Sequence, residues 1–277
     1  MLKTRVITAV LLLAGLLPAL FYLPPLGWAW LTAAALAIGG WEWGGFMQLK
    51  PVGRLSLGAA LFALCATVIL SFPSAMGGEG WSEVVALNVG AWFYVPSVLF
   101  WALVLPFWLR SRWPLPGVLG GLAVGVLILL PTWMALVQLR QLGVWPLVSI
   151  MAVVWVADIA AYFSGRAFGK RKMAPSISPG KTWAGAVGAV LGVQLYGFLA
   201  AAWLPKALQP NVPVFAVVLA VLTALSIVGD LFESLLKRQA GIKDSSNVLP
   251  GHGGVLDRID SLTSTLPFVA LLWLHLH

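Results

Sequence analysis

Residues 234–260 concentrate the polar side chains of an otherwise apolar chain. Charged residues make up 9% of the sequence, yet this segment holds seven of them and one of the three histidines. The charged residues are Lys237, Arg238, Lys243, Asp244, Asp257, Arg258 and Asp260. Glycines at 251, 253 and 254 allow the backbone to approach a ligand closely. Basic groups for phosphate, carboxylates for a cation and a glycine-rich loop together indicate a site for a metal-bound polyphosphate.

The carboxylates of this segment have the spacing of a cation site. Asp257 and Asp260 are three residues apart, so they share a face if the segment opens a helix. Asp230, from the preceding apolar segment, would complete the site. Oxygen ligands without a thiolate favour Mg²⁺ over zinc, and Mg²⁺ commonly takes one or two carboxylates plus substrate phosphate. His252, between glycines, is open to three interpretations: a phosphate donor, a nucleobase contact or a backbone cap.

Three acidic residues fall in or beside apolar segments that are long enough to cross a membrane. Asp158, Asp230 and Glu233 would be costly there unless they serve a function. Asp230, Glu233 and Lys237 recur at spacings of three and four, which places them on one helical face. A simple ion pair between Glu233 and Lys237 is the alternative for Glu233.

A second polar segment covers residues 165–182. It contains five basic residues, Arg166, Lys170, Arg171, Lys172 and Lys181. Its end, SPGKT, is similar to the end of a Walker A loop, but that motif requires glycine at 175, where the chain has Pro175, and a preceding strand, which we do not expect. Two interpretations stay open. Ser178, Lys181 and Thr182 hold a phosphate at a helix N-terminus, or Ser178-Pro179 forms a turn and Thr182 caps the helix.

The composition indicates how these segments are positioned. With 60% hydrophobic residues and a mean hydropathy of +0.94, the chain is far more apolar than soluble domains. We expect an all-α, polytopic integral membrane protein with a single transmembrane domain: hydrophobic helices over 1–150, and catalytic helices and loops over 151–277. The nine expected spans are about 5–23, 26–47, 54–72, 84–109, 116–138, 145–164, 183–204, 212–229 and 261–277.

The basic residues predict an orientation. Nine crossings with a cytoplasmic N-terminus place 15 of the 17 basic residues on the cytoplasmic side, and only Arg140 and Lys206 on the other. Both polar segments are then cytoplasmic. The net charge of +8 therefore reflects one cationic surface, which attracts acidic phospholipid or nucleotide. Topology explains this basicity, so we expect no nucleic-acid partner.

A transporter or channel is the main alternative to an enzyme, because paired intramembrane acids also build ion pathways. Here the polar clusters gather at one face instead of the midplane, and the two halves show no convincing inverted repeat. These features favour an enzyme.

The polar pattern over the C-terminal 120 or so residues resembles the signature of phosphatidate cytidylyltransferases, also called CDP-diacylglycerol synthases. The matching residues are Asp158 with Tyr162, Gly169-Lys170, Ser178 to Trp183, Gly229-Asp230-Leu231-x-Glu233-Ser234, Leu236-Lys237-Arg238, Lys243-Asp244, Leu249-Pro250-x-His252-Gly253-Gly254 and Asp257-Arg258-x-Asp260. Ala184 departs from the pattern, where a polar residue is expected, and leaves a contact at that position in doubt.

The resemblance implies conversion of CTP and phosphatidate to CDP-diacylglycerol and pyrophosphate, by a homodimer in the bacterial cytoplasmic (inner) membrane. It implies Mg²⁺ at Asp230, Asp257 and Asp260, with a second cation such as K⁺ as an option. The implied catalytic residues are Lys237, Arg238, Lys243, Asp244, His252 and Arg258. The implied substrate-binding residues are Asp158, Lys170, Ser178, Lys181, Thr182 and Glu233. The division of the basic residues between the two substrates stays open. A CTP-dependent polyprenol or phytol kinase is a closer alternative than a transporter. Such a kinase would have similar nucleotide-binding loops and a different binding site for the acceptor lipid.

Overall fold

The computed structural model describes residues 2–78, 82–208 and 211–276, which are mostly helical. The α-helices are α1 (Leu2–Tyr22), α2 (Pro25–Phe46), α3 (Pro51–Ser71), α4 (Glu83–Leu99), α5 (Leu105–Ser111), α6 (Gly117–Leu139), α7 (Val144–Phe168), α8 (Trp183–Ala200), α9 (Val212–Gln239) and α10 (Leu256–Leu276). Shorter turns are η1 (Pro73–Met76), η2 (Phe100–Val104), η3 (Arg140–Leu142), η4 (Ala201–Trp203) and η5 (Lys206–Leu208). The π-helical η2 joins α4 and α5 into one continuous rod.

Local sequence explains several helix starts. Pro25 and Pro51 occupy the first turns of α2 and α3, where a missing N–H is tolerated and the fixed φ suits a helix. The side chains of Thr182 and Asn211 cap α8 and α9 by accepting hydrogen bonds from Gly185 N and Val214 N. These caps define where two of the long helices begin.

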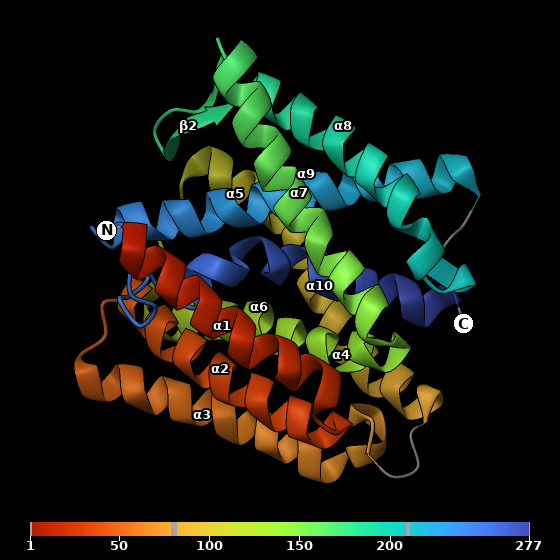
Figure 1. Cartoon of the computed structure of the whole chain (residues 1–277). Helices are drawn as coiled ribbons and strands as arrows, with labels where there is room; N and C mark the ends of the chain where they lie inside the picture. Colours follow the sequence, from red (N-terminus) through yellow and green to blue (C-terminus); the bar gives the residue numbers. More distant parts are fainter. Residues whose placement is uncertain (1, 79–81, 209–210, 277) are drawn as a thin grey trace.

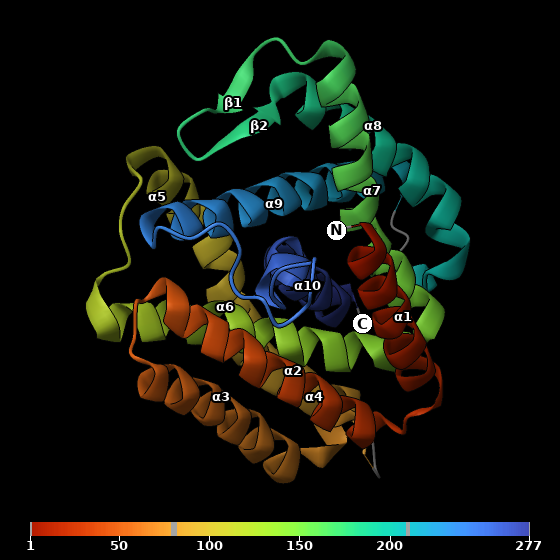
Figure 2. The same cartoon turned by 60° about the vertical axis from the view of Figure 1, so that its left-hand side comes forward.

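Helix α10 lies in the middle of the bundle, surrounded by the other helices (Figure 2). It packs against α9, α6, α4 and α7. Its buried hydroxyl groups donate to backbone carbonyls of α9: Ser261 Oγ to Ser226 O at 3.0 Å, and Ser264 Oγ to Leu225 O at 2.8 Å. The close approach requires Gly229, because a Cβ there would lie 2.8 Å from Asp260 O. This contact brings Asp230 beside the start of α10.

The structure supports a membrane protein but does not confirm nine spans. Six helical segments in the described residues are long and apolar enough to cross a membrane: Pro51–Ser71, Glu83–Ser111, Gly117–Leu142, Val144–Phe168, Trp183–Trp203 and Val212–Gln239. The apolar part of α1, Val6–Tyr22, is shorter than these. Helix α10 begins with Asp257 and Asp260 and carries buried serine and threonine residues, so its polar part packs within the protein. A helix therefore occupies each expected span, and six of the described helical segments have the length and hydropathy of a membrane span.

A small β-hairpin replaces the irregular loop expected over 165–182. Strands β1 (Lys172–Ala174) and β2 (Ser178–Thr182) pair antiparallel, with Lys172 opposite Thr182 and Ala174 opposite Ser178. Ser178-Pro179 is therefore part of a strand, and the interpretation that these two residues form a turn is wrong. The hairpin is held to the bundle by Ile177, which is buried in the hydrophobic core.

The polar segments gather at one end of the bundle. The start of α1, the hairpin and the connection between α9 and α10 lie at this end, and α10 ends at the opposite one (Figure 1). Helix α9 continues past the expected end of the membrane span near 229, to Gln239. Asp230, Glu233 and Lys237 therefore project from one helix, as their spacing predicted.

Candidate active site

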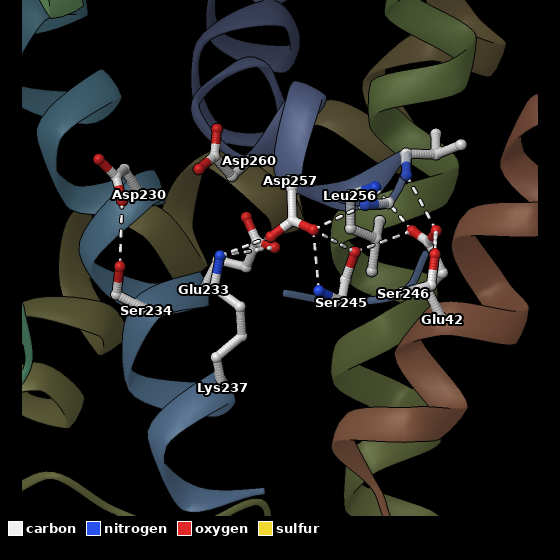
Figure 3. Close-up of polar contacts among 12 residues, drawn as sticks. Glu42, Asp230, Glu233, Ser234, Lys237, Ser245, Ser246, Leu256, Asp257 and Asp260 are labelled. Atoms are coloured by element: carbon white, nitrogen blue, oxygen red, sulfur yellow. Dashed lines mark hydrogen bonds and ion pairs between the residues drawn. The ribbon is translucent and has the colours of Figure 1, made fainter. Parts of the chain in front are cut away.

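An ion pair joins the hairpin to helix α9. Lys181 Nζ, from β2, lies 2.6 Å from Asp230 Oδ2 on α9. The other oxygen, Asp230 Oδ1, accepts a hydrogen bond of 3.1 Å from Ser234 Oγ (Figure 3). Both charged side chains are partly exposed, at 22% and 29%. The pair is thus accessible to a ligand and fixes the hairpin over the end of α9.

Further carboxylates lie around this pair. Asp158, on α7, interacts electrostatically with Asp230 and Lys181, and also with Arg258. Asp260, on α10, interacts with Asp230 and Asp158. Helices α7, α9 and α10 therefore direct three acidic groups into one region, where a bound cation would relieve their repulsion.

A second ion-pair group lies one helical turn along α9. Lys237 Nζ is 2.6 Å from Asp257 Oδ1 and 3.4 Å from Glu233 Oε1, so one ammonium group serves two carboxylates (Figure 3). The interaction between Glu233 and Lys237 that their spacing predicted is confirmed. Glu233 also interacts with Asp260, and both residues line a small apolar cavity with Trp43 and Phe232.

Asp257 organises the connection between α9 and α10. Its Oδ2 accepts hydrogen bonds of 2.8 Å from Ser245 N, Ser245 Oγ and Gly254 N. Asp257 lies outside the six membrane-spanning segments. Burial alone would raise the pKa of Asp257, but the hydrogen bonds from Lys237, Gly254 and Ser245 outweigh it and hold this pKa below its ordinary value. The side chain is therefore charged, with Oδ2 bound to the connection and Oδ1 paired with Lys237.

The carboxylates suit a hard cation that takes its remaining ligands from substrate and water. No three His, Cys, Asp or Glu side chains converge into a ready metal site in the part of the chain that the structure describes. Burial, followed by the charge of Asp230, raises the pKa of Asp260 to about 6. Asp260, which precedes the apolar part of α10, therefore faces another negative group across the gap between α9 and α10. This donor set fits Mg²⁺, which needs only one or two carboxylates besides phosphate oxygens.

The expected substrate-binding residues of the hairpin have different environments. Thr182 is buried, and its hydroxyl accepts from Gly185 N at 3.1 Å, so the capping interpretation is confirmed. Ser178 lies at the other end of β2, and Lys170 is exposed just before β1. Of the expected groups on this side, only Lys181 forms an ion pair within the described residues.

The remaining expected residues lie around the connection between α9 and α10. Lys243, Asp244, Arg238 and Arg258 are exposed, and Arg238 Nε donates to Ile177 O at 3.5 Å, from the end of α9 to the hairpin. His252 is half-buried, and its Nδ1 makes no hydrogen bond within the described residues. Of these side chains, Arg258 interacts electrostatically with Asp158, and Arg238 links the end of α9 to the hairpin.

Sequence reasoning did not single out three residues that hold this connection. Glu42, on α2, accepts hydrogen bonds from Ser245 Oγ and Ser246 Oγ at 3.3 and 2.6 Å (Figure 3). A carboxylate in an apolar segment was the available signal for Glu42, since such a residue is costly in a membrane. For the two serines the chain offers no comparable signal.

The same connection forms one wall of a polar pocket. Ser245, Ser246 and Asp244 line it from one side, and Trp41 and Arg54 from α2 and α3 line it from the other. The guanidinium of Arg54 lies 3.9 Å from the Trp41 ring centroid and donates to Trp41 O at 3.1 Å. The N-terminal helices thus contribute to the polar end of the bundle.

Comparison with known proteins identifies the family of the chain. The model of a family described as the cytidylyltransferase family matches residues 3–276. The chain is 44% identical to a phosphatidate cytidylyltransferase of Pseudomonas aeruginosa, over 99% of this chain and 97% of that protein. It is 36% identical to one of Haemophilus influenzae, over 97% of each. A third, from Thermotoga maritima, is 41% identical over 46% of this chain. The match covers both the N-terminal helices and the polar site, and the chain therefore belongs to the cytidylyltransferase family.

Proposed function

We propose that this protein transfers the cytidylyl group of CTP to phosphatidate, giving CDP-diacylglycerol and pyrophosphate for phospholipid synthesis. The observation that carries the proposal is the position of the two ion-pair groups. Lys181–Asp230 and Lys237–Asp257 lie at the polar end of a bundle of membrane-spanning helices. A site there is open both to a lipid head group at the interface and to a soluble nucleotide.

The reaction is an in-line displacement at phosphorus. A phosphate oxygen of phosphatidate attacks the α-phosphorus of CTP, the new P–O bond forms, and the bond from the α-phosphorus to the bridging oxygen of the β-phosphate breaks. The electron pair leaves with pyrophosphate. The phosphate of phosphatidate is already ionised near neutral pH, so the step requires no general base. The protein contributes positioning and charge neutralisation.

The two lysines are suited to this role. Lys181 and Lys237 each hold an ammonium group against a carboxylate, close to where the polyphosphate would lie. The exposed side chains of Arg238, Lys243 and Arg258 would receive the pyrophosphate or the lipid phosphate. His252, with an unpaired ring nitrogen, is placed to donate to a phosphate or a base. The polar pocket beside Asp244 offers space for the water-soluble substrate.

Mg²⁺, when bound, would supply charge neutralisation for the triphosphate. We propose Asp230, Asp260 and Asp257 as its protein ligands, and a second cation such as K⁺ would draw on the same group. Asp257 would act through Oδ1, because its Oδ2 is already occupied by three donors. Asp158 and Glu233 contribute further negative charge beside these ligands.

We also propose the bacterial inner membrane as the location, with the N-terminus and the site in the cytoplasm. The start of α1, the hairpin and the α9–α10 connection share one end of the bundle, which supports a common side for the basic segments (Figure 1). A homodimer follows from the family resemblance alone and stays a proposal.

An acceptor comparison tests the function. Purified protein in detergent is given CTP and Mg²⁺ with either phosphatidate or a polyprenol, and nucleotide-linked lipid and pyrophosphate are measured. The proposal predicts CDP-diacylglycerol and pyrophosphate with phosphatidate, lost in Asp257→Asn. Transfer of a single phosphate to the polyprenol would instead establish a kinase, and CTP-independent ion flux in vesicles would establish a transporter.

A further inference from the structure

Glu42 is a fully buried acidic residue in the N-terminal half of the chain. It belongs to α2, and its exposed fraction is 0%. Within the described residues it forms no ion pair with a lysine or arginine. A buried carboxylate without a cation is unfavourable unless hydrogen bonds compensate for its lost hydration. The partners of Glu42 therefore decide what the residue does.

All its hydrogen-bond donors come from the connection between α9 and α10. Ser246 Oγ and Val255 N donate to Oε1 at 2.6 and 2.9 Å, and Ser245 Oγ and Leu256 N donate to Oε2 at 3.3 and 2.7 Å (Figure 3). Val255 and Leu256 stand at the start of α10, where backbone N–H groups have no partner within the helix. Glu42 therefore caps α10 from a distant helix, and its negative charge suits the helix dipole.

The same hydrogen bonds lead to the proposed metal ligand. Ser245 Oγ contacts Glu42 Oε2 and also donates to Asp257 Oδ2. Gly254, whose N–H donates to Asp257, packs so tightly against Glu42 and Ser245 that a Cβ there would collide with both. A chain of hydrogen bonds thus runs from Glu42 through Ser245 to Asp257. A shift of the Glu42 carboxylate would shift the backbone that orients Asp257.

We propose that Glu42 is a positioning residue for the cytidylyl transfer, which clamps residues 245–256 so that Asp257 and Asp260 meet the substrate in reactive geometry. The expected effect on kcat rests on the proposed function. Through Glu42, the N-terminal helix α2 would support the active site. Glu42 itself touches neither substrate nor reacting atoms, so it acts through Ser245, Ser246 and the start of α10.

The test compares Glu42→Gln with the wild type. The carboxamide keeps the volume but replaces one acceptor oxygen with an NH₂ group, which faces donors and leaves at least one of them unsatisfied. Misplacement of reacting groups on the scale of 1 Å lowers rate by about 100-fold, so we expect kcat to fall by about 10- to 100-fold. KM for phosphatidate should change by less than about 3-fold, because the lipid contacts are not altered.

Tyr94→Phe is the matched control. Tyr94 is also fully buried, and its hydroxyl donates to Gln138 Oε1 at 2.7 Å in a part of the core away from the α9–α10 connection. Removal of this bond should lower stability without lowering kcat. Hydrogen exchange in detergent gives a second readout, since Glu42→Gln should accelerate exchange of residues 244–257 selectively, whereas Tyr94→Phe should not.

The outcomes are distinct. A Glu42→Gln protein with wild-type kcat, or one whose 244–257 amides exchange as slowly as in the wild type, would overturn the inference. If this variant fails to fold, Ser246→Ala removes the 2.6 Å donor to Glu42, together with the acceptor of a 3.1 Å hydrogen bond from Val248 N, and should show the same two effects at smaller size. If the wild type forms no nucleotide-linked lipid, the proposed function fails, and the exchange measurement still decides whether Glu42 clamps the connection.

Discussion

Lys181, in β2, and Asp230, in α9, form a 2.6 Å ion pair that joins the hairpin to the helix leading into residues 234–260. Without this pair, the hairpin would be only a basic segment beside the end of α9. The pair places the hairpin against the part of α9 that also carries Glu233 and Lys237. The site therefore has two walls, one from the hairpin and one from α9 and α10.

Lys181→Met should abolish most activity with little effect on stability. The ammonium group is the hairpin's contact with the acidic wall, and loss of one preorganised electrostatic group typically lowers kcat by about 100- to 1,000-fold. Because the pair is partly exposed, the free energy of unfolding should change by no more than about 1 kcal/mol. Steady-state kinetics and thermal unfolding in detergent measure both. Lys172→Met, an exposed lysine of the same hairpin, is the control. Equal losses in the two variants would contradict the assignment.

Lys237→Met should lower both stability and activity, whereas Lys243→Met should lower activity alone. Lys237 neutralises Glu233 and Asp257, whose side chains are only 7% and 4% exposed. Removing one partner of a buried pair leaves uncompensated charge and costs about 3 kcal/mol. Lys243 is exposed, so its loss removes only charge near the substrate. Denaturant unfolding and kinetics separate the two effects. A Lys237→Met protein as stable as Lys243→Met would show that the buried pair is unimportant for folding.

Asp260→Asn should stabilise the protein at alkaline pH in the presence of a chelator while it removes Mg²⁺-dependent activity. The pKa of Asp260 is raised to about 6 in the folded state, whereas an ordinary aspartate has a pKa of about 3.9. Between about pH 3.9 and about pH 6, the folded state therefore binds the proton more tightly than the unfolded state. Wild-type stability therefore falls as pH rises through this window, by on the order of 2 kcal/mol. Asparagine does not titrate.

The stabilisation by Asp260→Asn should accordingly be largest near pH 8 and shrink as the pH falls from about 6 towards about 4. Unfolding curves at several pH values, in EDTA, measure this difference. A variant that is destabilised equally at every pH would contradict the raised pKa of Asp260, which results from burial and then from the charge of Asp230.

Thr182→Ala should destabilise the hairpin and the start of α8, and Thr182→Ser should not. The hydroxyl caps α8 through Gly185 N, and such a cap contributes about 1 kcal/mol. Thermal unfolding of the two variants tests this role. If Thr182→Ala keeps wild-type stability but loses affinity for CTP, the residue is a substrate contact and not a cap.

Much of the polar site could be predicted from the sequence because it depends on local spacing. The three-residue separation of Asp257 and Asp260 and the four-residue separation of Glu233 and Lys237 place these groups on helical faces, and the structure has both helices. The apolar composition likewise indicated a helical membrane protein. The expected number of nine spans is not confirmed, because six helical segments of the described residues are long and apolar enough to cross a membrane.

The hairpin and the long-range contacts were not predictable from local patterns. Residues 172–182 contain Pro175, Pro179 and Gly180, which argue against strands, and their pairing depends on Ile177 entering the core. Similarly, Lys181 and Asp230 are distant in sequence and meet only because α7, α8 and α9 pack together. Glu42 was visible as a carboxylate in an apolar helix, but its partners at 245–256 required the fold.

The central claim is that the site transfers a nucleotidyl group, and two labelled forms of CTP test it directly. Purified protein is incubated with phosphatidate and Mg²⁺, and with CTP labelled at either the α- or the γ-phosphorus. Cytidylyl transfer predicts that the α-label enters the lipid and the γ-label leaves as pyrophosphate, with both processes lost in Asp257→Asn. Entry of the γ-label into lipid, or no incorporation of either label, would contradict the account.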